Sequence, residues 1–460
     1  MKRKFHESIL RAYDIRGIIG ETLNTEDAYT LGFKFSCFVR KKNNISKIVV
    51  GYDGRLSSKL LNTELIRGLE DAGSHVTSIG LCPSPMLYYA DKILRADGSI
   101  MITGSHNPSN YNGFKMMVYG KSLFGNDILK LAKFNAKGLS HKGTVKKFKI
   151  DESYLIKITE DIKNINSELK VIWDAGNGAT GNILKKMLKF LPGKHILINS
   201  EIDGTFPSHH PDPTEEKNLK QLKEKVAISN ADIGIAFDGD GDRIGIVDNK
   251  SRFVSGDKLL YIFASEVVKN NLGSTIISDV KASNKIFDEI KKIGGKPLMW
   301  KTGHSFIKEK MRKTKALLAG EMSGHIFFAD KYYGYDDALY ASIRLLKILS
   351  EKQIIYKLLK PFSKLISTPE IKIFCNDDIK FDVIKRCKAD ILNKYSDVNM
   401  IDGIRVNTKK GWFLIRASNT QPALIVRCEA ESKSNLNNLI LEVKDLLDKH
   451  DIKNNLQSFN

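Results

Sequence analysis

The sequence lacks the features that direct a chain to a membrane, to an oxidising compartment or to a zinc site. None of its 460 residues lies in a run of the roughly 20 apolar residues that a membrane-spanning helix needs. The basic N-terminal residues are followed by apolar positions that polar side chains interrupt, so no signal sequence is predicted. The five cysteines are scattered and include no C-x-x-C pair, which indicates neither a disulfide framework nor a zinc site. We therefore expect a cytoplasmic protein without a membrane partner.

Acidic residues are scarce relative to basic ones, with 53 Asp and Glu against 73 Lys and Arg, a net charge of +20. A field of this sign attracts nucleic acid, anionic lipid or phosphorylated small molecules. The lysines are spread along the whole chain and form no basic block with interleaved aromatic residues. We expect a lysine-rich solvated surface and no nucleic-acid partner, with nucleic-acid binding kept as an alternative to be tested.

The length is too great for one core and indicates about three or four domains. Strand and helix patterns alternate through most of the chain, as in the predicted strand 47–53 and the predicted helix 57–72, which favours parallel strands with crossover helices. After residue 369 the alternation weakens to shorter strands and a terminal helix at 434–450, so the last unit should differ. We place the domains at residues 1–149, 150–252, 253–366 and 367–460.

A serine on a tight loop is the first chemical signal. Residues 103–108 read TGSHNP and follow an apolar run at 98–102, which places Ser105 in a sterically open turn. A hydroxyl offered in this way can accept a phosphoryl group if a metal and cations neutralise the phosphate. The alternative is an ordinary surface turn with favourable turn residues.

Three carboxylates at alternate positions are the second signal. Residues 238–243 read DGDGDR, and the intervening glycines allow Asp238, Asp240 and Asp242 to converge on a hard divalent cation. A calcium EF-hand loop would need Gly and Glu where the chain has Arg243 and Asn249. An acidic turn without a metal is the other alternative, but packing three carboxylates together is repulsive unless a cation relieves it. Mg²⁺ is the ion expected for phosphoryl chemistry.

Together the two loops resemble those of the α-D-phosphohexomutase superfamily, in its phosphomannomutase/phosphoglucomutase branch. Two further stretches are similar to that family in the same order: GEMSGH at 320–325 resembles its sugar-recognition loop, and RASNTQP at 416–422 its phosphate-binding loop. The resemblance covers nearly the whole chain. It implies an α/β protein with four domains: three related α/β domains with mixed sheets, and a smaller α+β C-terminal domain, around a central cleft.

The resemblance also implies a reaction. Ser105 would carry a phosphoryl group, and Asp238, Asp240, Asp242 and the phosphoserine would hold one Mg²⁺. The enzyme would interconvert hexose 6-phosphate and hexose 1-phosphate through a hexose 1,6-bisphosphate, which also serves as activator. The partners would be phosphosugar substrates, and the protein a monomer or homodimer.

The chemistry of individual residues agrees with that scheme. Arg243 can stabilise the transferred group, and Arg416 offers a planar fork for the phosphate that does not react. The resemblance assigns further cleft positions. Catalytic roles fall to Lys115 and His304, as proton-transfer groups, and to Arg16, and substrate contacts to Tyr13, Lys281, Glu321, Ser323, His325, Ser418, Asn419 and Thr420.

Other functions fit parts of the sequence. The glycines at 176, 178 and 181 match G-x-G-x-x-G after a strand, with Glu201 and Asp203 about 20 residues on, as in a dinucleotide site. The pattern is weak alone, and no G-x-x-x-x-G-K-[ST] loop for ATP is present.

Met322 favours mannose and glucose phosphates as substrates, since the glucosamine-phosphate branch of the family commonly has Gln there. A phosphoglucosamine mutase, or a sugar-phosphate-binding protein without turnover, stays as an alternative.

Overall fold

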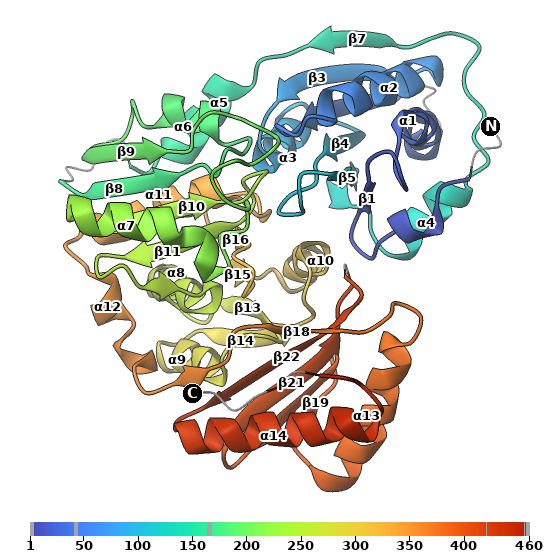
Figure 1. Cartoon of the computed structure of the whole chain (residues 1–460). Helices are drawn as coiled ribbons and strands as arrows, with labels where there is room; N and C mark the ends of the chain where they lie inside the picture. The colour runs from blue at the N-terminus through green and yellow to red at the C-terminus, as the bar shows by residue number, and fades with distance from the viewer. Residues whose placement is uncertain (1–3, 41–44, 163–167, 420, 455, 457–460) are drawn as a thin grey trace.

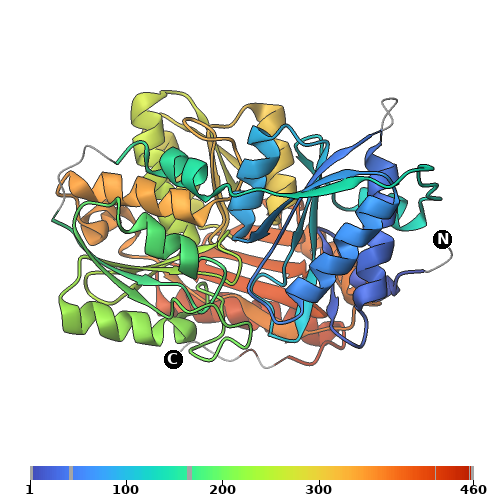
Figure 2. The ribbon, with the colours of Figure 1, turned by 90° about the horizontal axis from the view of Figure 1, so that it is seen from above.

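Four sheets surround a central cleft in the computed structural model (Figure 1). The structure describes residues 4–40, 45–162, 168–419, 421–454 and 456. Seen from above, the first unit (blue) and the second (green) lie on opposite sides, with the sheet of the last unit (red) beneath them (Figure 2). No helix among these residues is both long and apolar enough to cross a membrane.

The first three sheets share one strand pattern. In each, the first strand lies between two parallel neighbours, and a fourth strand pairs antiparallel beyond the third. The strands, in this order, are β2 (Lys47–Tyr52), β3 (His75–Leu81), β4 (Gly98–Ile102) and β5 (Tyr111–Val118); β8 (Lys170–Asp174), β9 (Lys194–Ile198), β10 (Ile233–Phe237) and β11 (Ile244–Asp248); and β13 (Thr275–Asp279), β14 (Lys296–Trp300), β15 (Leu318–Gly320) and β16 (Ile326–Phe328). The prediction of three related α/β units with mixed sheets is confirmed.

Helices and short edge strands complete these units. Helix α1 begins with a capping box, because the Asn24 side chain accepts from the Asp27 N–H while the Asp27 carboxylate accepts from the Asn24 N–H. The helices are α1 (Thr25–Val39), α2 (Ser58–Asp71), α3 (Ser84–Ile93), α4 (Asn126–Lys133), α5 (Asp151–Thr159), α6 (Gly181–Met187), α7 (Lys220–Ser229), α8 (Gly256–Asn270), α9 (Asn284–Lys292), α10 (His304–Thr314), α11 (Ala338–Ser350) and α12 (Ile355–Leu358), with 3₁₀ turns at Glu7–Ile9, Glu216–Leu219 and Lys360–Phe362. The edge strands are β1 (Ile15–Ile18), β6 (Lys121–Ser122), β7 (Thr144–Lys147) and β12 (Phe253–Val254).

One apolar core runs through the first three units. It includes Tyr88, Trp173 and Phe263, each at most 2% exposed, so side chains from all three units pack against one another. The central strands β4 and β10 are buried at every position, as expected for strands with both faces covered. The last unit has a separate core between its sheet and its two helices.

The last sheet is antiparallel throughout, with α13 (Lys380–Lys394) and α14 (Lys433–Lys449) on its outer face (Figure 1). Its strands are β17 (Ile366–Ser367), β18 (Ile371–Phe374), β19 (Val398–Asn399), β20 (Ile404–Thr408), β21 (Gly411–Ala417) and β22 (Ala423–Ala430). Strands β17, β18, β19 and β20 have two to five residues, as the prediction of shorter strands expects, but β21 has seven and β22 has eight, as many as β5. Arg427 and Glu429 interrupt its apolar run, since that face of the strand is turned toward the third unit.

The repeated strand pattern brings four loops to the same place. The serine loop (residues 103–110) joins β4 to β5, the aspartate loop (residues 238–243) joins β10 to β11, and the glutamate loop (residues 321–325) joins β15 to β16. Each therefore follows the third strand of its unit and precedes the antiparallel fourth. The turn between β21 and β22 approaches from the last unit, so all four predicted motifs line one cavity.

Helices α1 and α2 touch through their backbones, and this contact predicts a stability effect. A Cβ on Gly32 would lie 2.2 Å from the Leu65 carbonyl oxygen, and one on Gly68 would lie 2.1 Å from the Tyr29 carbonyl oxygen. Gly32→Ala should force the helices apart and cost about 1–3 kcal/mol of unfolding free energy. Calorimetry should show an earlier thermal transition for this variant and an unchanged one for Thr63→Ala on the exposed face of α2. Wild-type melting of Gly32→Ala would contradict the close contact.

Candidate active site

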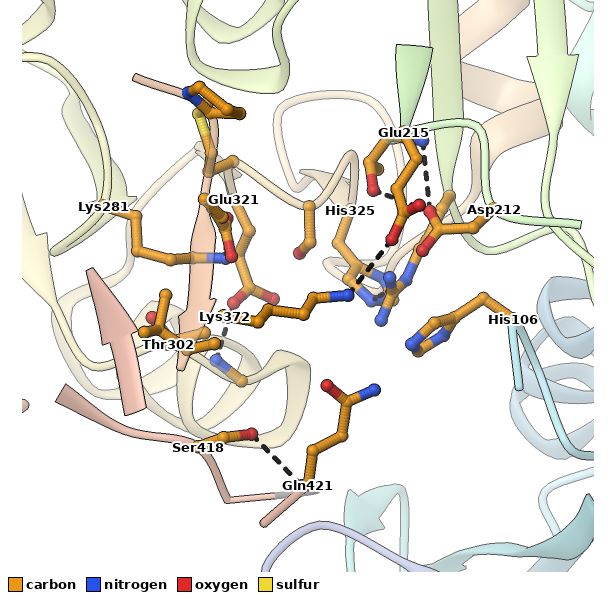
Figure 3. Close-up of a pocket in the computed structure, with 18 of the residues that line it drawn as sticks. His106, Asp212, Glu215, Lys281, Thr302, Glu321, His325, Lys372, Ser418 and Gln421 are labelled. Atoms are coloured by element: carbon orange, nitrogen blue, oxygen red, sulfur yellow. Dashed lines mark hydrogen bonds and ion pairs between the residues drawn. The ribbon is translucent and has the colours of Figure 1, made fainter. Parts of the chain in front are cut away.

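A cavity of about 780 Å³ lies where the four loops meet. Figure 3 shows His106 of the serine loop across this cavity from Glu321 of the glutamate loop and Ser418 of the last unit. Most of the predicted site residues line it: Tyr13, Arg16, Ser105, Lys115, Arg243, Lys281, His304, Glu321, Ser323, His325, Arg416, Ser418 and Asn419. Asp238, Asp240 and Asp242 are fully buried beside Ser105, and Thr420 falls outside the described residues.

Ser105 is held in an unusual backbone conformation with its hydroxyl on the aspartate loop. Its φ of 49° is left-handed, which costs a non-glycine residue on the order of 1 kcal/mol. The Oγ donates to Asp238 Oδ2 at 2.9 Å. A Cβ on Gly239 would lie 2.5 Å from the Ser105 carbonyl oxygen, so glycine at that position lets the two loops touch. The first and second units thus bring a hydroxyl against a carboxylate.

The three aspartates form a buried acidic cluster. Oxygens of Asp238, Asp240 and Asp242 lie within 4.8 Å of one another. Burial and the charges of its two neighbours raise the pKa of Asp238 well above its usual value. Oδ1 of Asp240 and Oδ1 of Asp242 are buried without a hydrogen-bond partner. Orphaned carboxylate oxygens that repel one another suit a hard divalent cation, so the donor set fits such an ion.

Lys115 is the cation nearest to this cluster. It lies on β5, directly after the serine loop, and its Nζ donates to Asp240 Oδ2 at 2.7 Å and also to Asp242 Oδ2. Burial alone would lower its pKa, but the two carboxylates raise the pKa well above its usual value. Lys115 is therefore held as an ammonium ion between the aspartates and the cavity.

His325 supports Arg243 from behind. The Arg243 Nε donates to His325 Nε2 at 3.1 Å, and His325 Nδ1 lies 3.0 Å from Asp336 Oδ2. Lys308 donates to the other oxygen of Asp336 at 2.9 Å. His325, which was predicted to contact substrate, lines the cavity, is buried, and stacks its ring against His304. The histidine thus connects Arg243 to a buried carboxylate that sequence reasoning missed.

His304 stands at the start of α10 and is kept neutral. Burial and the charge of Lys308 lower its pKa well below the usual value for histidine. A neutral imidazole can accept a proton at the cavity wall, whereas the charged Lys115 can donate one. The two groups predicted for proton transfer therefore differ in charge because their surroundings differ.

Glu321 offers one free oxygen to the cavity. Its Oε1 accepts from the Gly303 N–H at 2.6 Å, whereas its Oε2 is buried without a partner. Burial raises the pKa of this carboxyl group to about 6. Ser323 lines the same wall, and the Met322 sulfur between them contacts Arg427 Nη1 at 2.9 Å. This wall can accept hydrogen bonds from hydroxyl groups.

Basic groups from the third and last units gather at the other end. Arg416 Nε donates to Asp402 Oδ2 at 3.1 Å, and Lys281 Nζ donates to Glu370 Oε1 at 2.6 Å. Asn419 Nδ2 donates to the Tyr13 hydroxyl at 2.5 Å, which joins the N-terminal segment to the last unit. The charge and planar fork of Arg416 suit a phosphate dianion.

Several residues of the site carried no motif in the sequence. They are Asp53, Arg55, Lys308, Asp336, Glu370 and Asp402. Asp53 could have been found, because a carboxylate at the carboxyl end of a predicted parallel strand lies where α/β sheets place their ligands. Asp336 and Asp402 lie in irregular segments, where neither spacing nor flanking residues distinguish them.

The glycine pattern at 176–181 has a packing explanation. A Cβ on Gly178 would lie 2.8 Å from the Gly239 carbonyl oxygen, and one on Gly181 would lie 2.1 Å from the Ser200 carbonyl oxygen. The Ala179 N–H also donates to the Gly239 carbonyl at 2.9 Å. These glycines let the turn pack against the aspartate loop and the end of β9, so the pattern requires no nucleotide.

Family models match the chain in four consecutive parts. They describe phosphoglucomutase/phosphomannomutase alpha/beta/alpha domain I at residues 7–140, domain II at 152–251 and domain III at 255–369, and the C-terminal domain at 370–446. These matches follow one another in the order of the four sheets.

Similar proteins cover almost the whole chain. The phosphomannomutase/phosphoglucomutase of Pseudomonas syringae pv. tomato is 45% identical, over 94% of this chain and 93% of its own. A phosphoglucomutase of Neisseria meningitidis is 40% identical over 96% of both chains. The crystal structure of a phosphoglucomutase/phosphomannomutase family protein from Burkholderia thailandensis superposes with a TM-score of 0.90 at 38% identity, covering 99% of this chain and 100% of that one.

The acidic cluster predicts a measurable metal affinity. Isothermal titration of the protein with Mg²⁺ should show one binding event, and Asp240→Asn should weaken it by at least about tenfold, because a ligand oxygen and a negative charge are lost. Asp91→Asn, which alters a buried carboxylate on α3 that does not line the cavity, serves as the matched control. Equal affinities of the wild type and Asp240→Asn would show that the cluster holds no metal.

Proposed function

The chain belongs to the phosphoglucomutase/phosphomannomutase family and is a phosphohexomutase, and we propose that Ser105 is the residue that carries its phosphoryl group. The enzyme interconverts hexose 6-phosphate and hexose 1-phosphate, with a phosphoserine enzyme and a hexose 1,6-bisphosphate on the path. The observation that supports this role of Ser105 most directly is its hydroxyl, 2.9 Å from Asp238 at the edge of the buried acidic cluster.

The phosphoryl group that moves between Ser105 and the sugar carries negative charge, which the site must neutralise. In the forward step the bond from phosphorus to Ser105 Oγ breaks, a bond to the free sugar hydroxyl forms, and the hydroxyl proton leaves. A divalent cation held by Asp238, Asp240, Asp242 and the phosphoserine would offset the phosphate charge at that step. Arg243, fixed by His325, would stabilise the charge on the transferred group.

We assign proton transfer to two groups that differ in charge. His304 is neutral and can take the proton from the attacking hydroxyl, whereas Lys115 is charged and can protonate a departing oxygen. In the second half of the reaction the bisphosphate presents its other phosphate to Ser105, and the proton moves in the opposite direction. Two groups held in different charge states suit a reaction that runs both ways.

The remaining residues would hold the substrate in both orientations. We assign the phosphate that is not reacting to Arg416, with Lys281, Ser418, Asn419 and Tyr13 near it. Arg16 donates to Asn107 Oδ1 of the serine loop, so we assign it to the reacting end. Asp402 and Glu370 pair with the two cations now, so a phosphate would compete with these carboxylates. The free oxygen of Glu321 and the Ser323 hydroxyl would bind sugar hydroxyls.

We assign mannose and glucose phosphates as the substrates. The similar enzymes of Pseudomonas and Neisseria are named for these sugars, and Met322 stands where the glucosamine-phosphate branch commonly has Gln. Its sulfur is in contact with Arg427, which fixes the side chain beside Glu321. A phosphoglucosamine mutase is the competing assignment.

A coupled assay tests the function. With Mg²⁺ and a trace of glucose 1,6-bisphosphate, the enzyme should turn over mannose 1-phosphate and glucose 1-phosphate, and Ser105→Ala should abolish turnover because the phosphoryl carrier is lost. Ser342→Ala, which alters a buried serine on α11, should leave the rate unchanged. Turnover of glucosamine 1-phosphate alone would overturn the substrate assignment, and full activity of Ser105→Ala would refute the carrier role.

The raised pKa of Glu321 predicts a pH dependence. As the pH falls below about 6, this carboxylate takes up a proton and can no longer accept two hydrogen bonds. The ratio of wild-type to Glu321→Gln kcat/KM should therefore fall between pH 8 and pH 5.5. The ratio cancels the titration of the substrate phosphate, which both enzymes share. A ratio that stays constant over this range would show that the Glu321 carboxylate does not bind the sugar.

A further inference from the structure

Arg55 lies directly beneath the serine loop. It follows β2, is 3% exposed, and its guanidinium group donates to three backbone carbonyl groups of that loop and to one at the start of β5. The acceptors are Ser105 at 2.8 Å, Asn107 at 2.6 Å, Pro108 at 2.5 Å and Tyr111 at 2.9 Å. One side chain therefore fixes the backbone from the nucleophile to the start of β5.

Asp53 holds the other side of the same loop. Its Oδ2 accepts from the Gly104 N–H at 3.2 Å and lies 3.3 Å from Arg55 Nε. Its Oδ1 accepts from the Arg55 N–H and from the Ser58 hydroxyl at the start of α2. These two residues, which follow β2, thus bind N–H and C=O groups on both sides of Ser105. Strand β2 lies in the middle of its sheet.

This clamp accounts for the left-handed conformation of Ser105. A serine has no intrinsic preference for a φ of 49°, so surrounding contacts must hold it there. Arg55 Nη2 binds the Ser105 carbonyl itself, which opposes rotation of that peptide out of its strained position. A planar fork can serve several carbonyl oxygens at once, whereas the single ammonium group of a lysine cannot match that geometry.

The second unit encloses the clamp. The ring of Phe206 lies over the Arg55 guanidinium at 5.0 Å. The two units also pack closely at two glycines: a Cβ on Gly54 would lie 2.3 Å from Ile202 Cγ2, and one on Gly204 would lie 2.5 Å from the Leu56 nitrogen. The bond from Arg55 to the Ser105 carbonyl is therefore buried, whereas the bonds to Asn107, Pro108 and Tyr111 are partly buried.

We propose that Arg55, paired with Asp53, is a positioning residue for phosphoryl transfer. It acts through the serine loop, by holding Ser105 in the conformation that aims its Oγ at Asp238 and the acidic cluster. This inference rests on the proposed role of Ser105 as phosphoryl carrier. It assigns to the end of β2 a part in the reaction, although neither side chain has a place in the predicted motifs.

Steady-state kinetics of Arg55→Lys tests the inference. Because misplacement of the nucleophile affects the chemical step, kcat should fall by about 100-fold, whereas KM should change by less than about threefold, since the substrate contacts are intact. Arg344→Lys is the matched control, because Arg344 is equally buried but pairs with Glu266 and Asp330 away from the cavity. It should lower the thermal midpoint and leave kcat unchanged.

The ³¹P NMR spectrum of the phosphorylated enzyme gives a second readout. The phosphoserine resonance should shift or broaden in Arg55→Lys and stay in place in Arg344→Lys. Asp53→Asn, which keeps the arginine but loses the charge on the other side of the loop, should change kcat and the resonance in the same direction, and it serves if Arg55→Lys does not fold.

The results distinguish a wrong function from a wrong role for Arg55. If the wild type has no mutase activity, the proposed function itself is wrong. If the wild type is active while soluble Arg55→Lys or Asp53→Asn retains wild-type kcat and the wild-type ³¹P resonance, Arg55 is a structural residue only and the inference is overturned.

Discussion

The structure depends on the burial of three carboxyl groups beside one serine. Asp238, Asp240 and Asp242 are fully buried, and like charges at such separations repel strongly in a poorly hydrated site. Hydrogen-bond donors therefore surround them: the Lys115 ammonium group binds two of the carboxylates, and the backbone N–H of Arg243 binds the third. The orphaned oxygens that remain mark where a divalent ion would complete the balance. Phosphoryl chemistry follows from this arrangement, because a cluster that accepts a cation also accepts the phosphate that the cation neutralises.

The fold brings this chemistry together by repetition. Three units place a loop between the third strand and its antiparallel fourth, so Ser105, the three aspartates and Glu321 lie at equivalent corners. Their shared core fixes these corners relative to one another. The last unit, with its own core, supplies Arg416 and closes the cavity through polar contacts such as Asn419 with Tyr13. The Arg416 side of the cavity is therefore built differently from the side that holds Ser105 and the aspartates.

The sequence motifs identified the loops of the site, but not the contacts between residues that lie far apart in the chain. Residue order within TGSHNP and DGDGDR was sufficient to single out Ser105 and the three aspartates as candidates, and the structure places them side by side. The clamp of Arg55, the carboxylate behind His325 and the partner of Arg416 join segments far apart in the chain, and no local pattern encodes them. The long strand β22 was underestimated for a related reason, since the charged residues on its inner face make hydrogen bonds to the third unit. Alternation of strands and helices did predict the mixed α/β units.

The central claim is that Ser105 alone carries the phosphoryl group through the reaction. Mass spectrometry of peptides, after the enzyme has been treated with glucose 1,6-bisphosphate, tests it most directly. The account predicts one phosphate per chain, located on Ser105, which disappears when excess hexose monophosphate is added. A phosphate on another residue, or an enzyme that turns over hexose phosphates while Ser105 never becomes labelled, would contradict the account.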